Sequence, residues 1–278
     1  MVLTAVIFFS VCDLFAKYLT RFYPIGLIVW ARFTFHLLFI VVTVGPRFGF
    51  ALVRTKRLGI QILRGLLLVT GSAFFVTALK YMPLAEATAV AYLAPIFVTI
   101  MSVLFLKEEI ELARWLAVLC GFVGVLTIIR PGSEVFTWAV FLPIGNALCF
   151  ATYQILTRRL AGVDSPYTSI FYAGLVGSVL SLAALPLVWT APQNLMHALA
   201  FVSVGVLGGF GHLILIKAYN HGPASRLAPF SYSQLIWVAA IGFFVFGDFP
   251  DTFSLIGIGI LVGSGVYIAT HQRKASRR

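Results

Sequence analysis

The chain is built from apolar runs of about twenty residues, separated by short connections rich in glycine, proline and basic residues. Ten runs can be placed, at about 2–20, 25–44, 59–80, 84–106, 112–130, 138–157, 166–189, 196–219, 227–246 and 252–270. Each run has the length that a helix needs to cross a bilayer. The runs are continuously apolar, whereas the strands of a membrane barrel alternate over about ten residues. The pattern therefore predicts an all-α membrane protein with ten transmembrane helices.

The charge content excludes a soluble protein of this size. Only 10% of the 278 residues are charged and 60% are hydrophobic, whereas soluble domains carry about 25% charged residues. The net charge of +11 would suggest nucleic acid as a partner of a soluble protein. Here the basic residues lie between apolar runs, which indicates a membrane face. We therefore expect the lipid bilayer, and no nucleic acid, as the partner of this surface.

The basic residues of the connections predict the orientation of the chain. One set of connections, with the C-terminal tail, holds fourteen: Arg47, Arg54, Lys56, Arg57, Lys107, Arg114, Arg158, Arg159, Lys217, Arg226, Arg273, Lys274, Arg277 and Arg278. The opposite set holds three: Arg21, Lys80 and Arg130. Cytoplasmic loops carry the excess of Lys and Arg in membrane proteins. Both termini are therefore expected in the cytoplasm of a bacterium, with the chain in its cytoplasmic (inner) membrane.

The two halves of the chain share one segment frame. A shift of 140 residues superposes the apolar runs without a gap and aligns Gly65 with Gly205 and Tyr92 with Tyr232. This predicts two five-helix repeats, 1–137 and 138–278. Five spans is an odd number, so the repeats must insert with opposite topology. Inverted repeats around a site near the membrane midplane are typical of transporters, although a duplicated membrane protein need not transport.

Three stretches carry a resemblance to a known family. Residues 83–95 (PLAEATAVAYLAP) and 103–132 (VLFLKEEIELARWLAVLCGFVGVLTIIRPG) resemble the first half of an EamA-type member of the drug/metabolite transporter superfamily. Residues 218–247 (AYNHGPASRLAPFSYSQLIWVAAIGFFVFG) resemble its second half. The resemblance implies ten helices in two inverted repeats around a central cavity, and transport of a small organic metabolite by alternating access. Asp13 and Lys17, spaced D-x-x-x-K, resemble a bacterial subgroup with riboflavin and S-adenosylmethionine transporters.

The chain departs from the family at two positions. Lys107 stands where glycine is usual, and Asp248 stands where the family has glutamate. Glu108 and Asp248 each precede a predicted helix, where a carboxylate can accept from free N–H groups and face the positive end of the helix dipole. We therefore expect both acids to cap helices.

Asp13 lies near the middle of the first apolar run, where a charged side chain costs at least about 2.5–3.5 kcal/mol. It should be protonated, paired, or in contact with a wet cavity. Lys17 lies one turn away and could pair with it or extend to the outer face. Arg32 offers a second partner, because the two positions are almost equally far from Phe22 in the connection and so lie at similar depth in an antiparallel hairpin.

Asp13 and Arg32 admit two interpretations. They could form a substrate site with two charged groups, suited to a zwitterion, or an ion pair that only stabilises the fold. We expect Asp13 to face the cavity and to bind an amine, another cation or a coupling proton.

Other polar and aromatic groups within the runs complete the predicted substrate site. Tyr92 and Tyr232 are equivalent in the two halves, and aromatic faces with a few polar groups suit an amphipathic organic solute. The candidate substrate-binding residues are Asp13, Lys17, Arg32, Tyr92, Asn146, Tyr153, His212, Tyr232, Gln234 and Trp237. Arg64, near the start of its run, is expected to extend towards the membrane surface.

No motif for ATP, a metal or another cofactor is present, so a gradient or exchange is expected to drive transport. An enzyme embedded in the membrane would need a catalytic cluster such as H-E-x-x-H, which the sequence lacks. We therefore expect no enzyme activity. A passive channel or a lipid scramblase stays open as an alternative to the carrier.

Overall fold

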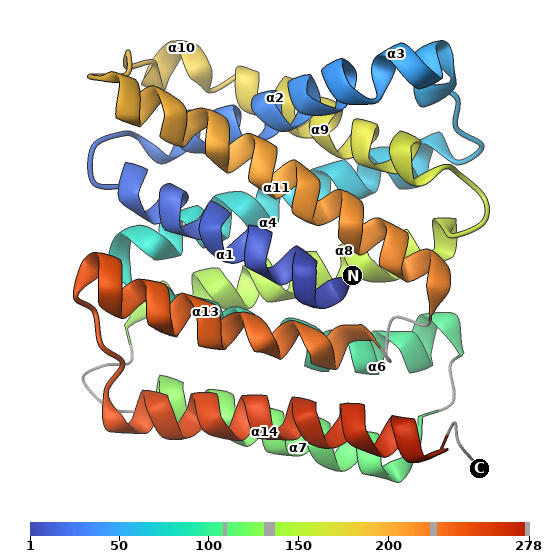
Figure 1. The fold of residues 1–278 in the computed structure, drawn as a ribbon, viewed down its shortest axis with the longest axis vertical. Coiled ribbons are helices and arrows are strands. Elements are labelled where there is room, and N and C mark those ends of the chain that lie inside the picture. Colours follow the sequence, from blue (N-terminus) through green and yellow to red (C-terminus); the bar gives the residue numbers. More distant parts are fainter. Residues whose placement is uncertain (108–109, 131–136, 223–226, 276–278) are drawn as a thin grey trace.

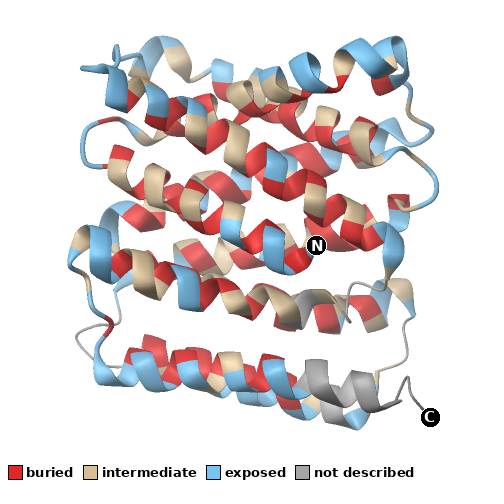
Figure 2. Cartoon of the chain, viewed as in Figure 1, coloured by how far each residue is buried: buried red, intermediate tan, exposed pale blue. Residues whose placement is uncertain are grey.

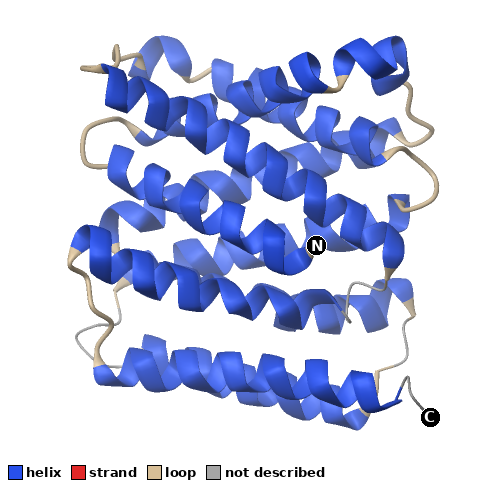
Figure 3. Ribbon diagram, in the orientation of Figure 1, coloured by secondary structure: helices blue, strands red, loops and turns tan. Residues whose placement is uncertain are grey.

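The structure, a computed structural model, describes residues 1–107, 110–130, 137–222 and 227–275. Within these ranges the chain folds into helices and loops, with no strand (Figure 3). Several residues of the sequence analysis, Glu108, Arg226, Arg277 and Arg278, lie outside the described ranges. The all-helical class that the apolar runs predict is confirmed for the described part of the chain.

The helices follow the predicted runs closely. In the first half they are α1 (Val2–Leu19), α2 (Ile25–Thr43), α4 (Leu58–Tyr81), α5 (Leu84–Ala91), α6 (Ala94–Leu106) and α7 (Leu112–Ile129). In the second half they are α8 (Phe141–Leu160), α9 (Pro166–Leu182), α11 (Leu195–His221), α13 (Gln234–Ile241) and α14 (Thr252–Ala275). Short elements extend them or fill connections: α3 (Gly45–Phe48), η1 (Gly49–Leu52), η2 (Trp138–Val140), α10 (Leu185–Val188), η3 (Ala228–Ser233) and η4 (Gly242–Phe246).

Six helical segments of the described chain are long and apolar enough to cross a membrane. They are Val2–Leu19, Ile25–Thr43, Leu58–Tyr81, Leu84–Leu106, Trp138–Leu160 and Leu195–His221. Four shorter apolar helical segments, Trp115–Ile129, Pro166–Leu182, Phe230–Phe246 and Thr252–Tyr267, account for the other predicted spans. The chain is thus an integral membrane protein by helix length and composition, and the count of ten spans stays a prediction.

The helices lie side by side, and both termini point towards the same end of the bundle (Figure 1). Helix α1 packs along α11, and α4 packs along α8. Helices α2 and α9 pack together on one flank, while α7 and α14 pair along the opposite flank. Buried residues concentrate in the middle of the bundle and exposed residues follow its flanks (Figure 2).

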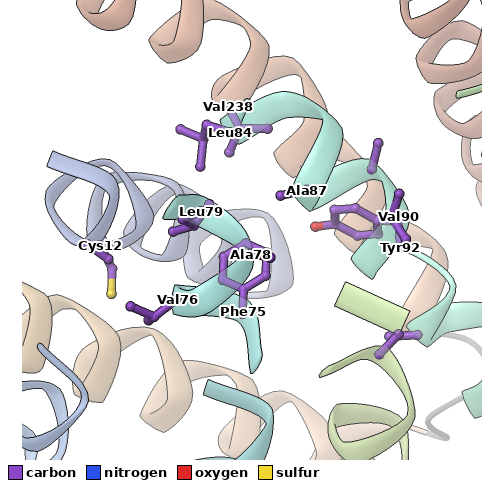
Figure 4. Packing of buried hydrophobic residues seen from close by; sticks show 14 of the residues in the cluster. Cys12, Phe75, Val76, Ala78, Leu79, Leu84, Ala87, Val90, Tyr92 and Val238 are labelled. Carbon is purple, nitrogen blue, oxygen red and sulfur yellow. The ribbon is translucent and has the colours of Figure 1, made fainter. Parts of the chain in front are cut away.

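One large apolar cluster joins the two halves of the bundle. Figure 4 shows part of it, in which Cys12 of α1, Val76 and Leu79 of α4 and Leu84 of α5 are all buried. Helix packing in a membrane depends on close contact, because lipid is as apolar as the side chains. The cluster therefore holds the inner helices in register around whatever space they enclose.

Two predicted spans are interrupted near their middle. The segment 84–106 divides between α5 and α6 at Tyr92 and Leu93, and Pro95 lies in the first turn of α6. Proline has no backbone N–H and is tolerated at a helix start, which favours a new helix at this point. In the other half, η3 ends at Ser233 and α13 begins at Gln234. Both tyrosines of the predicted repeat pair, Tyr92 and Tyr232, therefore lie at helix breaks.

Glycines let α11 approach α2 closely. A Cβ at Gly205 would lie 2.4 Å from Phe35 Cβ and 2.8 Å from the backbone nitrogen of His36. Backbone atoms cannot move aside as the end of a side chain can, so this contact requires the absence of a side chain at residue 205.

We expect Gly205→Ala to lower the melting temperature of the purified protein in detergent. Overpacking of this kind costs about 1–3 kcal/mol. The matched control is Gly259→Ala in α14, where a Cβ meets nothing within 4 Å and alanine favours the helix by about 1 kcal/mol. Equal melting temperatures for the two variants would contradict the packing described here.

Candidate functional site

A cavity of about 110 Å³ lies inside the bundle. Its walls come from α1, α2, α4, α8 and α11 and from the two helix breaks, at α5–α6 and η3–α13. Aromatic rings of Phe9, Phe75, Tyr92 and Phe150 form much of the lining. The polar side chains that line it are Asp13, Arg32, Ser72, Thr88, Asn146, Gln154, His212, Ser231 and Gln234. An internal space with apolar walls and a few polar groups can hold an organic solute or several waters.

Asp13 is held at the cavity wall by three helices. Its Oδ1 lies 3.8 Å from Arg32 Nη1, and its Oδ2 accepts a hydrogen bond of 3.1 Å from Gln234 Nε2. Gln234 in turn accepts a hydrogen bond of 2.8 Å from the Tyr92 hydroxyl through Oε1. The contact between Asp13 and Arg32, predicted from their matching depth, is thus present. It is long for a hydrogen bond, so the two charges attract each other without a tight pair.

Lys17 does not contact Asp13 and does not line the cavity. Its ammonium lies 3.0 Å from Asp248 Oδ2 and donates to the Met82 carbonyl at 3.2 Å. The same ammonium lies 5.3 Å from the ring centroid of Phe246, and the Arg21 guanidinium lies 5.0 Å from it. These contacts join α1 to the ends of α4 and η4, at the end of the bundle opposite the termini.

The structure corrects the role that the sequence analysis gave to Asp248. Asp248 pairs with Lys17, while Asp251 accepts from the Ser254 N–H at 2.8 Å and so caps α14. Asp251 also accepts from Arg130 Nη2 at 2.5 Å, which ties α7 to the start of α14. A cap requires a residue directly before the helix, and the extra residues between Asp248 and Thr252 shift this role to Asp251.

The other predicted site residues divide into two groups. Asn146 and His212 line the cavity together with Asp13, Arg32, Tyr92 and Gln234. Tyr153, Tyr232 and Trp237, like Lys17, are outside the lining. The Tyr232 ring lies 5.3 Å from that of Tyr92, the Tyr153 ring lies 5.6 Å from that of His212, and Trp237 is 46% exposed on α13.

Sequence reasoning did not select Ser72, Thr88 or Ser231, which line the cavity. Serine and threonine are common in helices and carry little signal of their own. The repeat frame offered one, because Ser72 is 140 residues before His212. Gln154 was noticed within its span, and its carbonyl oxygen accepts a hydrogen bond from the Tyr219 hydroxyl.

Arg64 is fully buried, which overturns the prediction that it extends to the membrane surface. Its Nε donates to the Thr157 hydroxyl at 2.9 Å and its Nη1 donates to Gln61 Oε1 at 2.6 Å. Its guanidinium lies 4.8 Å from the ring centroid of Tyr153, which is also fully buried. Arg64 thus connects α4 to α8 inside the bundle, because these groups satisfy most of its donors.

Asp164, in the connection between α8 and α9, continues this polar cluster. It accepts from the Thr55 hydroxyl at 2.5 Å, the Lys56 N–H at 3.0 Å and Gln61 Nε2 at 2.9 Å. Burial acts to raise the pKa of Asp164, but these hydrogen bonds outweigh it and hold the pKa below its ordinary value.

Asp164→Ala is expected to lower the melting temperature at neutral pH. A carboxylate with a depressed pKa stabilises the fold above the ordinary pKa of Asp, and this contribution is lost as the pH falls through the lower, folded-state pKa. The difference between variant and wild type should therefore shrink below about pH 4. The control is Glu111→Ala, an exposed acid with no side-chain cap bond in α7, and a difference independent of pH would contradict this role.

The comparisons with known proteins agree with this architecture. The model of the EamA-like transporter family matches residues 1–130 and 137–270. An S-adenosylmethionine uptake transporter of Rickettsia conorii is 31% identical over 97% of this chain and 91% of its own. A riboflavin transporter of Vibrio cholerae is 34% identical over 81% of this chain and 76% of its own. A solved crystal structure with 20% identity has a TM-score of 0.73 and covers 98% of both chains.

These matches define the class and then the family. The chain is an integral membrane transporter of small metabolites, and it is not an enzyme. It belongs to the EamA-like transporter family. The resemblance that the sequence motifs indicated is thereby confirmed.

Proposed function

We propose that this protein is a secondary carrier of the bacterial cytoplasmic membrane that moves an amphipathic organic metabolite by alternating access through its central cavity. The observation that carries the proposal is a buried carboxylate, Asp13, at the wall of that cavity beside Arg32. Hydrocarbon does not tolerate isolated charge, so a charged pair beside an internal space marks a solute pathway.

An arrangement of ten spans in two inverted repeats, 1–137 and 138–278, has support from the cavity itself. Residues 140 positions apart line the same space: Ser72 and His212, Phe75 and Leu215, Ala91 and Ser231, and Ala94 and Gln234. The helix contacts repeat too, since α1 packs along α11 as the equivalent α8 packs along α4. The family model also matches two stretches, one in each half.

Both termini are assigned to the cytoplasm. They lie towards the end of the bundle that also holds the connection with α3 and the basic residues Arg47, Lys56 and Arg57 (Figure 1). An excess of Lys and Arg in short loops marks the cytoplasmic side.

The contacts at the opposite end form an outer gate. Lys17 and Asp248 join α1 to the end of η4 there, and Met82 adds the end of α4. Along α1, the cavity is lined by Val6, Phe9 and Asp13, which lie before Lys17 on the cytoplasmic side. The structure therefore represents a state whose outer end is held shut, and transport requires the contacts of Lys17 to break.

The lining favours a cargo with an aromatic ring system and polar or amine groups. Phe75, Tyr92 and Phe150 offer apolar faces, while Asp13 and Arg32 offer opposite charges. Relatives are named for S-adenosylmethionine and riboflavin, which both combine ring systems with polar groups. Asp13 binds an amine or other cationic group, or a coupling proton. Asn146, His212 and Gln234 complete the binding set.

Asp13→Asn should reduce uptake into proteoliposomes by roughly tenfold or more, because removal of one partner of a buried pair leaves the other charge uncompensated. Initial rates are measured with radiolabelled riboflavin and S-adenosylmethionine over a range of concentrations, together with counterflow. The control is Asp164→Asn, the same change away from the cavity. Saturable wild-type uptake with unchanged rate and pH dependence in Asp13→Asn would remove Asp13 from the site, and unsaturable wild-type flux would indicate a channel.

The double variant Asp13→Asn with Arg32→Gln separates the two interpretations of the pair. If the pair only stabilises the fold, removal of both charges should restore transport along with stability. If the pair binds cargo, the double variant stays inactive while its melting temperature recovers.

The outer gate is tested with Lys17→Ala and Asp248→Asn. Each should speed labelling of Ser72→Cys by a membrane-impermeant thiol reagent added from outside, by roughly two- to fivefold, since a partly exposed pair contributes about 1 kcal/mol at most. Exchange of the two charges, Lys17→Asp with Asp248→Lys, should slow labelling again. Lys80→Ala, a change of an exposed lysine at the same end, is the control, and equal labelling in all variants would overturn the gate.

A further inference from the structure

Four buried polar atoms at the cavity wall have no hydrogen-bond partner among the described residues. They are Arg32 Nη1, Ser72 Oγ, Thr88 Oγ1 and His212 Nδ1. Ser72, Thr88 and His212 are each less than 10% exposed. Buried polar groups in folded proteins almost always have a partner, so atoms that lack one inside a cavity indicate a partner supplied from outside the chain.

The two hydroxyls are unusual for helical serine and threonine. Such side chains commonly bond to the carbonyl one turn back. Thr77, in the same helix as Ser72, does so with Ala73 at 2.7 Å, and Thr99 does so with Pro95 at 2.9 Å. Ser72 and Thr88 also lie within helices, yet neither makes such a bond. Their hydroxyls are therefore left for a group in the cavity.

The charged groups of the cavity are already engaged with one another. Asp13 accepts from Gln234 and faces Arg32, and the other end of the Gln234 amide accepts from Tyr92. The unused capacity at Ser72, Thr88 and His212 is neutral, since hydroxyls both donate and accept and an imidazole can do either. A neutral hydrogen-bonding group of the ligand fits these atoms better than a second charge.

We propose that Ser72 and Thr88, with His212, form a subsite for the neutral, hydroxylated part of the cargo. This inference rests on the proposed function and adds a specificity element to it. The aromatic lining, Phe75 and Phe150 among it, holds a ring system, and the subsite selects cargo that also carries hydroxyl groups. A site built to bond a hydroxyl discriminates against a ligand without one, because its own buried groups then stay unpaired.

The test uses wild-type protein, Ser72→Ala and Thr88→Val in proteoliposomes, with radiolabelled riboflavin and S-adenosylmethionine as probes. Both probes carry hydroxyl groups. Each variant should raise the KM of the transported probe roughly three- to tenfold, the loss expected for one hydrogen bond, with little change in maximal rate. Thr88→Ser, which keeps the hydroxyl, should restore the wild-type KM.

Thr99→Val is the matched control. It removes a buried threonine hydroxyl that bonds within its own helix and is outside the cavity lining. It should leave KM unchanged and lower the melting temperature, whereas Thr88→Val should leave the melting temperature of the ligand-free protein unchanged or raise it. A structural role for Thr88 predicts the opposite result for stability.

The outcomes separate this inference from the proposed function. Saturable wild-type transport with an unaltered KM in both Ser72→Ala and Thr88→Val overturns the subsite and leaves the carrier intact. Absence of saturable uptake and counterflow of either probe by the wild type overturns the proposed carrier of such metabolites, and the subsite with it.

Discussion

The structure depends on the cost of placing charge in hydrocarbon. Asp13 and Arg32 lie deep in the first two helices, where neither can be solvated by lipid. Their contact fixes the sides of α1 and α2 that face inward, and Gln234 and Tyr92 extend the same network to α13 and the break after α5. The apolar packing around these helices would allow other rotations, but the buried charges do not.

The cavity is symmetric in its framework and asymmetric in its chemistry. Equivalent positions of the two halves line it, yet the counterpart of Asp13 is Tyr153 and that of Lys17 is Thr157. In the second half, Tyr153 and Thr157 contact Arg64, which fastens α4 to α8. One half thus supplies the acid at the cavity, while the other uses the equivalent positions for packing. An asymmetric cargo can therefore bind in one orientation.

The errors of the sequence analysis have a common cause. Depth in the membrane follows from counting residues, which is why the pairing of Asp13 with Arg32 could be predicted. The direction in which a side chain points around its helix does not follow from counting when nearly every neighbour is apolar. Lys17 was therefore assigned to the substrate site although it binds Asp248, and Arg64 was assigned to the surface although it is fully buried. Ser72 and Thr88 were missed because helical hydroxyls usually bond to their own backbone.

The sequence by itself determined the helical class, the helix bounds, the frame of 140 residues and the family, since these depend on local hydropathy, helix breakers and motifs. Only the tertiary structure decided which polar groups meet. Asp13 finds Gln234 from the far end of the chain, and Lys17 finds Asp248, through contacts that no local pattern encodes. The physical reason is that a bilayer rewards an apolar run in almost any rotation, while a hydrogen bond or ion pair requires one particular arrangement of neighbouring helices.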